Sequence, residues 1–287
     1  MMKHFFLFLA AGWMAVSCVI NIGGGSFVGH CTEEGIDLTE VREVGPFRAL
    51  ASSLPCNVYY VQADRQEVRV ESTGEFAPKV LTEVEGGTLK LKLEPGRYPK
   101  LILRVVVSSP DIESLHVSGS GNLINEGSLH AGGDLDLKVS GSGDIRTGAI
   151  DSKALTARCS GSGALRLEEV RCSGFSATVS GSGDLRMGRV SCSGFSATVS
   201  GSGHIVAQAV EAGGDASARI SGSGRIRLEE VDVDGDMDLK TSGSGDISVN
   251  GACHHVTATT AGSGDISGRL SHTGISTHTS GSGRVNL

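Results

Sequence analysis

The sequence predicts an all-β protein built as a single-stranded parallel β-helix, or β-solenoid, with about 20 residues per coil. Two observations predict this fold. A Ser-Gly-Ser-Gly tetrapeptide recurs at steps of 19 to 22 residues, and an aliphatic residue follows each copy at a fixed distance. Self-similarity at this period is typical of a solenoid, in which each repeat packs against its neighbours. We expect the solenoid to be right-handed.

The tetrapeptide marks one corner of each coil. Its copies begin at Ser118, Ser140, Ser160, Ser180, Ser200, Ser221, Ser242 and Ser280, with a variant at Ala261. Glycine at a corner permits a positive φ or a close approach of two backbones. A flexible linker is the alternative for a Ser-Gly repeat, but linkers do not keep aliphatic residues in register. The predicted structural corner residues are Gly119, Gly121, Gly141, Gly143, Gly181, Gly183, Gly201 and Gly203.

Apolar and polar residues alternate on both sides of each tetrapeptide, which indicates strands rather than helices. Ahead of one copy, Phe175, Ala177 and Val179 lie on one face, and Ser176 and Thr178 on the other. Each repeat therefore sends short apolar segments inward from up to three sides. The apolar position after the tetrapeptide is held by Leu123, Ile145, Leu165, Leu185, Ile205, Ile226, Ile247, Ile266 and Val285, and a further one by Ile150, Val170, Val190, Val210 and Val231.

The first residues predict export. Residues 1–17 have a basic start and then an apolar run, too short to span a bilayer, which is typical of a signal peptide. Ala15-Val16-Ser17-Cys18 resembles a bacterial lipobox. Ordinary secretory cleavage would cut at about the same place, but we favour lipidation of Cys18, because a Gly-rich stretch follows. We therefore expect residues 18–38 to tether a lipoprotein to the outer membrane, on either its periplasmic or its surface face.

The two ends of the predicted solenoid differ. Residues 39–107 contain strands bounded by Gly, Pro and Asp, with a hairpin turn expected at Gly86-Gly87. We interpret this region as an N-terminal β-rich cap, because the open end of a solenoid exposes unpaired backbone. The solenoid then occupies residues 108–287. Its C-terminal strand, 284–287, shows no cap, so this end either pairs with a second copy or is blunted by Arg284 and the terminal carboxylate.

Composition agrees with this architecture. Glycine accounts for 42 of 287 residues and aromatic residues for only 4%, as expected for many tight corners and small core residues. The net charge is −7, and the sequence has no extended basic segment. Binding to nucleic acid is therefore disfavoured.

The repeats resemble a known family. The signature Ser-Gly-Ser-Gly-Asp followed by Ile or Leu, as at Asp144-Ile145 and Asp246-Ile247, is similar to the family described as putative auto-transporter adhesin, head GIN domain. The segments 44–50 and 115–121 fit the same layout, and the resemblance covers about residues 40–287. It implies a β-helix-like domain, commonly found on lipoproteins of Bacteroidetes. It supplies no catalytic residues and no cofactor.

Six cysteines follow Cys18, and their spacing does not suggest a disulfide framework. Cys159 occupies a column otherwise held by valine, which predicts a small core residue. Cys172 and Cys192 hold the same position in neighbouring coils, where the strand spacing of about 4.8 Å lies within the Cα range of a disulfide. Parallel Cβ directions disfavour that bridge without excluding it. The Cys and His spacings do not predict a zinc site.

Two carboxylates are the candidate ligand-binding residues. Asp246 and Asp265 share an outward column in neighbouring coils, where they could hold a cation or act as a pair in polysaccharide cleavage. The alternative, which we favour, is that they bind the backbone of the corner. A second outward column combines basic and hydroxyl residues, and we expect Asp136 and Asp238 to pair with cations of that column across coils.

These observations favour a non-catalytic lipoprotein of the cell envelope that presents a rigid solenoid as an adhesin or envelope-interaction module. The membrane, through the N-terminal lipid, and a glycan or protein ligand are the expected partners. Two alternatives remain: a β-helix protein that binds or cleaves polysaccharide, and a structural protein that self-assembles through its C-terminal end.

Overall fold

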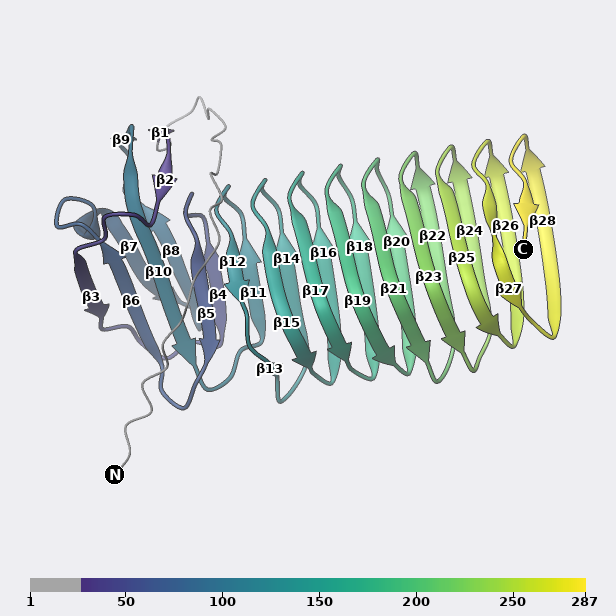
Figure 1. Cartoon of the computed structure of the whole chain (residues 1–287), viewed down its shortest axis with the longest axis horizontal. Coiled ribbons are helices and arrows are strands. Elements are labelled where there is room, and N and C mark those ends of the chain that lie inside the picture. Colours follow the sequence, from purple (N-terminus) through teal and green to yellow (C-terminus); the bar gives the residue numbers. More distant parts are fainter. Residues whose placement is uncertain (1–26) are drawn as a thin grey trace.

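The computed structural model describes residues 27–287 and shows the predicted parallel β-solenoid (Figure 1). The predicted signal peptide and Cys18 lie outside the described residues. Each coil contributes one strand to each of two sheets, and each stacked strand pairs with its equivalents in the coils before and after it. Within these described residues the chain is nearly all β, with one short 3-10 helix, η1 (Ala77–Lys79).

The first sheet has 15 strands. From the C-terminal end its order is β29 (Val285–Asn286), β27 (Ile266–Ser271), β25 (Asp246–Cys253), β23 (Arg225–Val233), β21 (His204–Ala212), β19 (Asp184–Cys192), β17 (Ala164–Arg171), β15 (Ile145–Asp151), β12 (Leu123–Asn125), β5 (Val58–Gln62), β10 (Leu101–Ser109), β6 (Glu67–Ser72) and β3 (Leu38–Arg42); β13 (Leu129–His130) also pairs with β15, and β2 (Cys31–Thr32) with β10.

The second sheet has 12 strands. Its order is β28 (Gly274–Gly281), β26 (His255–Gly262), β24 (Met237–Gly243), β22 (Ala216–Gly222), β20 (Gly194–Val199), β18 (Gly174–Val179), β16 (Ala154–Cys159), β14 (Leu135–Val139), β11 (Ser114–Val117), β4 (Ala49–Ser52), β8 (Thr88–Leu93) and β7 (Val80–Glu85).

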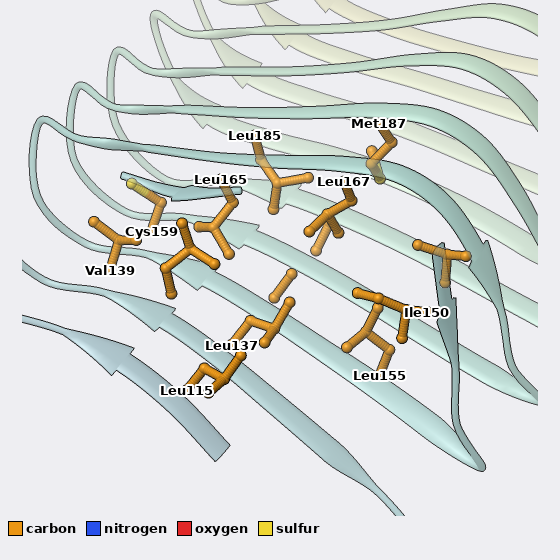
Figure 2. Packing of buried hydrophobic residues seen from close by; sticks show 14 of the residues in the cluster. Leu115, Leu137, Val139, Ile150, Leu155, Cys159, Leu165, Leu167, Leu185 and Met187 are labelled. Atoms are coloured by element: carbon orange, nitrogen blue, oxygen red, sulfur yellow. The ribbon is translucent and has the colours of Figure 1, made fainter. Parts of the chain in front are cut away.

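The parallel strands stack in register, so equivalent residues of successive repeats form columns. Leu165, Leu185 and Ile205 are direct partners across β17, β19 and β21. The aliphatic column that follows the tetrapeptide is fully buried from Leu123 to Ile266, and the column from Ile150 to Val231 is buried as well. These side chains fill the space between the two sheets (Figure 2). The inward columns predicted from the period-two pattern are confirmed.

The long strands turn a corner within their length. In β17 the alternation breaks where Glu168 and Glu169 both face outward, between the buried Leu167 and Val170. Two successive outward residues change the direction of the strand, so apolar side chains reach the core from a third side. Opposite them, the stacked rings of Phe175 and Phe195 lie with centroids 5.6 Å apart.

Antiparallel strands extend both sheets at the N-terminal end. In the first sheet β10 pairs with β5 in parallel and with β6 in antiparallel, and β6 continues to β3. In the second sheet β7 and β8 form an antiparallel hairpin. Gly86 and Gly87 supply its turn with φ values of 56° and 74°, so the predicted hairpin turn is confirmed. Pairing with these strands covers the first coil on this side.

The predicted tether is too long. Within its range, β1 (Phe27–Val28) pairs with β9 (Arg97–Tyr98), and β2 pairs with β10. Val28 and Cys31 are buried in the main core. Two-residue strands are too short to show a period, and their partners lie about 70 residues later in the chain. Within residues 27–287 the structure has no helix that is long and apolar enough to cross a membrane.

Candidate functional site

The outer surface of the 12-stranded sheet is rich in hydroxyl groups. Alternate residues of each strand point away from the core, so nine coils build three outward columns. We call this surface the hydroxyl face. Its first column is Ser114, Asp136, Thr156, Ser176, Ser196, Ser217, Asp238, Thr257 and Ser276; its second is His116, Lys138, Arg158, Thr178, Thr198, Arg219, Lys240, Thr259 and His278; its third is the first residue of each tetrapeptide.

Serine or threonine fills most of these positions: seven of nine in the first column, three in the second and eight in the third. Along a column the groups repeat at the strand spacing of about 4.8 Å. Nine coils therefore present a polar strip roughly 40 Å long. Such a strip can donate and accept hydrogen bonds at regular intervals.

The second column adds positive charge to this face. Its nine residues include four cations and two histidines but no carboxylate. Arg158 binds Asp136 at 2.6 Å, and Arg219 binds Asp238, so the predicted pairing across coils is confirmed. The first column contributes only these two carboxylates, and both are engaged.

Two lysines of the second column have no carboxylate partner among the described residues. Lys138 and Lys240 form no ion pair with any residue that the structure describes. They lie on β14 and β24, so they flank a stretch dominated by hydroxyl groups. The hydroxyl face therefore carries uncompensated positive charge on a protein that is acidic overall.

His116 belongs to this face and is neutral near pH 7. Its Nε2 lies 2.6 Å from Oγ of Ser140 in the next coil. Burial, and then the charge of Lys138, lower the pKa of His116, while Asp136 opposes them. The imidazole therefore acts here as a hydrogen-bonding group rather than as a cation.

A shallow depression lies at one border of the hydroxyl face. Its volume is about 210 Å³, and three first-column residues line it. Two of its carboxylates are held by neighbouring groups. Oδ1 of Asp215 accepts a hydrogen bond from the N–H of Asp236 at 2.9 Å, and Oδ1 of Asp236 lies 3.1 Å from Nδ1 of His254. Oriented carboxylate oxygens can accept hydrogen bonds from hydroxyl groups of a ligand. The lining residues are Phe195, Asp215, Ala216, Ser217, Asp236, Met237, Asp238 and Thr257.

The corner glycines lie where successive coils approach each other closely. A Cβ on Gly143 would lie 1.9 Å from the carbonyl oxygen of Gly121, and one on Gly141 would lie 2.1 Å from that of Gly119. Close backbone approach, not φ, therefore requires glycine at these two positions. A positive φ appears at the equivalent corner only in later coils, as at Gly243 with φ 118°.

Asp246 and Asp265 bind the backbone of the following coil. Oδ1 of Asp246 accepts a hydrogen bond from the N–H of Asp265 at 3.1 Å, and Oδ1 of Asp265 accepts one from the N–H of Arg284 at 2.8 Å. Asp144 does the same for Ala164 at 2.9 Å. This is the geometry expected if the carboxylates organise the corner. Over residues 27–287, the structure holds no group of three His, Cys, Asp or Glu side chains placed to bind a metal ion.

All six cysteines within residues 27–287, Cys31 and Cys56 included, are free thiols in the structure. Cys159 lies buried in its valine column, as predicted. Cys172 and Cys192 are half-buried neighbours that form no disulfide. Burial raises the pKa of Cys172 to about 11, and burial together with the neighbouring Cys172 raises the pKa of Cys192 to about 12. Cys18 lies outside the described residues.

Comparison with known proteins identifies the family. The family model described as putative auto-transporter adhesin, head GIN domain, matches residues 46–229 and 211–287. The chain belongs to this family. The head GIN family description indicates an exported protein associated with the cell envelope and gives no indication of catalysis. None of the curated proteins searched matches the chain.

Solved structures of other proteins share the fold. A putative adhesin from Parabacteroides merdae has a TM-score of 0.64 at 17% identity, over 92% of this chain and 99% of its own. A putative lipid binding protein from Parabacteroides distasonis has a TM-score of 0.63 at 19% identity, over 91% and 98%. A putative adhesin from Bacteroides fragilis has a TM-score of 0.51 at 18% identity, over 90% and 99%.

The first column and the depression were not predicted as a site. The Ser and Thr pattern of that column was present, since Ser176 and Ser196 recur at the same position before the tetrapeptide. The residues that line the depression come from four successive coils, whose turns differ in length and sequence. Its geometry depends on those turns, which the repeat pattern does not specify.

Proposed function

We propose that this head GIN protein is a non-catalytic lipoprotein of the outer membrane that binds an acidic polysaccharide along its hydroxyl face. The family description supports an adhesive role at the cell envelope. The single observation that carries the proposal is the hydroxyl face itself, where aligned hydroxyl groups and a basic column run the length of the rod.

The shape of this face favours a long ligand. Each coil repeats the same groups at about 4.8 Å, so a polymer lying along the rod meets equivalent partners at each step. Many weak contacts on one rigid surface combine into stronger binding than any single contact provides. The depression beside Asp238 adds a place where the hydroxyl groups of a sugar ring can bond with Ser217, Asp236 and Thr257.

The charge of the face favours acidic repeats. Lys138 and Lys240 are uncompensated, and the second column contains no carboxylate to repel an anion. Binding that depends on exposed charges weakens as salt screens them over a Debye length of about 8–10 Å near physiological ionic strength. We therefore expect affinity for an acidic polysaccharide to fall as salt rises.

Membrane anchoring through Cys18 is the second part of the proposal. The lipobox-like sequence and the signal peptide support it. Cys18→Ser is expected to abolish acylation and to release the protein from the membrane fraction, as measured by metabolic lipid labelling. Unchanged labelling of this variant would reject the anchor and leave the binding face unaffected.

A binding screen tests the adhesive role. The form that lacks residues 1–18 is applied to arrays of acidic polysaccharides, neutral polysaccharides and host-matrix proteins, and the chain length of each polysaccharide is measured after incubation. The expected result is saturable, salt-sensitive binding to acidic polysaccharides without shortening. Shortening would favour the carbohydrate-active alternative, and binding to neither class of polysaccharide would reject the proposal.

Self-assembly is a second candidate because β28 leaves one edge unpaired within the described residues. Ile275 on this strand is 41% exposed, although the equivalent Val256 one coil earlier is fully buried. Light scattering can compare the wild type with Ile275→Lys and with a chain lacking residues 270–287. A dimer that both changes dissociate would support this candidate, and a monomeric wild type would reject it.

A further inference from the structure

We propose that Cys31 and Cys56 form a disulfide in the exported protein. This bridge fastens the anchor segment, the N-terminal part of the chain that includes β1 and β2, to the solenoid. The inference rests on the export indicated by the family and on the proposed N-terminal anchor. Both cysteines are buried, with exposed fractions of 8% and 2%, and both belong to the main core.

The two cysteines lie along the same edge of β10. In β2, Cys31 pairs with Leu101 of β10, and its Sγ lies 3.8 Å from the carbonyl oxygen of Leu103. Further along this edge, the carbonyl oxygen of Asn57 accepts a hydrogen bond from the N–H of Val105 at 3.2 Å. Cys56 precedes Asn57 and is therefore beside the level of Leu103. Hence the two side chains enter the core at nearly the same place.

Polar contacts hold the two segments together next to the thiols. Oε1 of Glu33 accepts hydrogen bonds from Nδ2 of Asn57 at 2.8 Å and from the hydroxyl of Tyr59 at 2.9 Å. Burial, and then the neighbouring thiol of Cys31, raise the pKa of Cys56 well above its usual value.

Oxidation requires an external disulfide, such as a thiol–disulfide oxidoreductase of the envelope or oxidised glutathione. One cysteine thiolate attacks the oxidant, forms a mixed disulfide and releases one thiol of the oxidant. The second cysteine then attacks the mixed disulfide, closes the Cys31–Cys56 bond and releases the other thiol. The protein loses two electrons and two protons, and the oxidant is reduced to two thiols. Because the folded state disfavours the Cys56 thiolate, we expect the bridge to close during folding.

The bridge would matter most under tension. β1 and β2 have only two residues each, so few backbone hydrogen bonds hold the segment that leads to Cys18. A pull between a bound ligand and the membrane anchor passes through this segment. A covalent bond from Cys31 to Cys56 transfers that pull directly to the strand β5 inside the main sheet.

Peptide mapping of the full chain tests the bridge. The chain is produced with export, alkylated under denaturing conditions without reductant and digested with trypsin. Cys31 lies in the peptide that ends at Arg42, and Cys56 lies between Arg48 and Arg65, so the two cysteines fall in separate peptides. Cys18 shares the first peptide, so fragmentation of the linked pair is used to distinguish Cys31 from Cys18. The expected product is one linked pair of these peptides, two hydrogens lighter than their sum. Cys172 and Cys192 are expected to be alkylated and serve as an internal control.

The same peptide mapping, repeated on protein refolded in a glutathione redox buffer, tests whether the bridge can form independently of whether the protein is exported. A linked pair in vitro but not in cells would argue against export to an oxidising compartment. Alkylation of both cysteines under both conditions would overturn the bridge. A second measurement is thermal: Cys31→Ser, Cys56→Ser and the double variant are expected to lower the melting temperature equally, by roughly 5–10 °C. Unequal or additive shifts would also contradict a shared bond.

Discussion

At the scale of single residues, the difference between neighbouring side chains defines the solenoid. Leu185 is fully buried, whereas Asp184 beside it lies at the surface, 2.9 Å from Arg186. The partners one coil later, Ile205 and His204, show the same contrast. A burial boundary that repeats between adjacent residues can be tested with matched substitutions.

Leu185→Asp should destabilise the protein strongly, because it removes apolar burial worth about 2–5 kcal/mol and buries an unpaired charge. Asp184→Ser should cost less than about 1 kcal/mol, because an exposed ion pair contributes little. Urea melts of these two variants, and of Ile205→Asp and His204→Ser, measure the contrast. Equal destabilisation at inner and outer positions would reject the assignment of the two faces.

The corner glycines offer a second matched pair. Gly143→Ala should destabilise the protein by about 1–3 kcal/mol, because its Cβ would meet a backbone carbonyl that cannot rotate away. Gly127→Ala is the control, since its Cβ would meet no atom within 4 Å and its φ is not in the left-handed region. Its cost should stay within about 1 kcal/mol. Equal melting temperatures for the two variants would contradict the close approach of the coils.

Residues of the repeat were the most predictable part of the molecule. Leu185 and Cys159 could be placed inside because nine or so copies of one pattern reinforce each other. Asp246 could be placed outside, but the identity of the N–H group that donates a hydrogen bond to its carboxylate depends on how the coils stack at the corner. A sequence period fixes which side a residue faces, whereas its hydrogen-bond partner depends on atomic distances.

At the scale of elements, the N-terminal strands depend on a polar network that crosses β5, β6 and β10. Arg104 on β10 binds Glu71 and Glu33 and lies 5.8 Å from the ring centre of Tyr59. The hydroxyl of Tyr59 donates to Glu33. This network joins the anchor segment to the first sheet next to the proposed Cys31–Cys56 bridge.

The network predicts a loss of stability at high pH. Burial, and then the Glu33 carboxylate, raise the pKa of Tyr59 to about 12 from its ordinary value of about 10. The folded state therefore retains the phenol proton where the unfolded chain loses it. This contribution is complete below about pH 10 and is lost as pH rises towards 12. Tyr59→Phe should flatten the decline in melting temperature over this range, and an unchanged decline would contradict the assignment.

The N-terminal strands were less predictable than the coils. The Gly86-Gly87 hairpin is local, so its turn chemistry could be recognised. The pairing of β2 with β10 joins residues about 70 positions apart and involves only two residues of each strand. The sequence therefore contains no periodic pattern from which this pairing could be predicted. Cys31 and Cys56 come near each other only because both lie beside β10, so their proximity could not be predicted either.

At the scale of the whole molecule, repetition aligns outward side chains of successive coils into one extended surface. One serine or lysine at the surface has little significance, but nine coils in register align such residues into columns about 40 Å long. The sheet on the opposite side carries cations too, but carboxylates of the same sheet accompany them. Arg166 and Arg186 are paired with Asp144 and Asp184, and Arg227, which forms no ion pair with a described residue, is followed by Glu229 and Glu230 in β23. The two faces of the rod therefore differ in their balance of charge, and we expect them to differ in binding.

A comparison of the two faces tests the central claim most directly. Lys138→Glu with Lys240→Glu reverses charge on the hydroxyl face, and Arg186→Glu with Arg227→Glu makes the same change in net charge on the 15-stranded sheet. Affinity for the best acidic polysaccharide of the screen is measured for both double variants, after circular dichroism shows that each remains folded. We predict a loss of about tenfold or more, which is 1.4 kcal/mol or more, for the lysine variant and less than about twofold for the arginine variant. Equal losses from both variants, or no loss from the lysine variant, would contradict binding at the hydroxyl face.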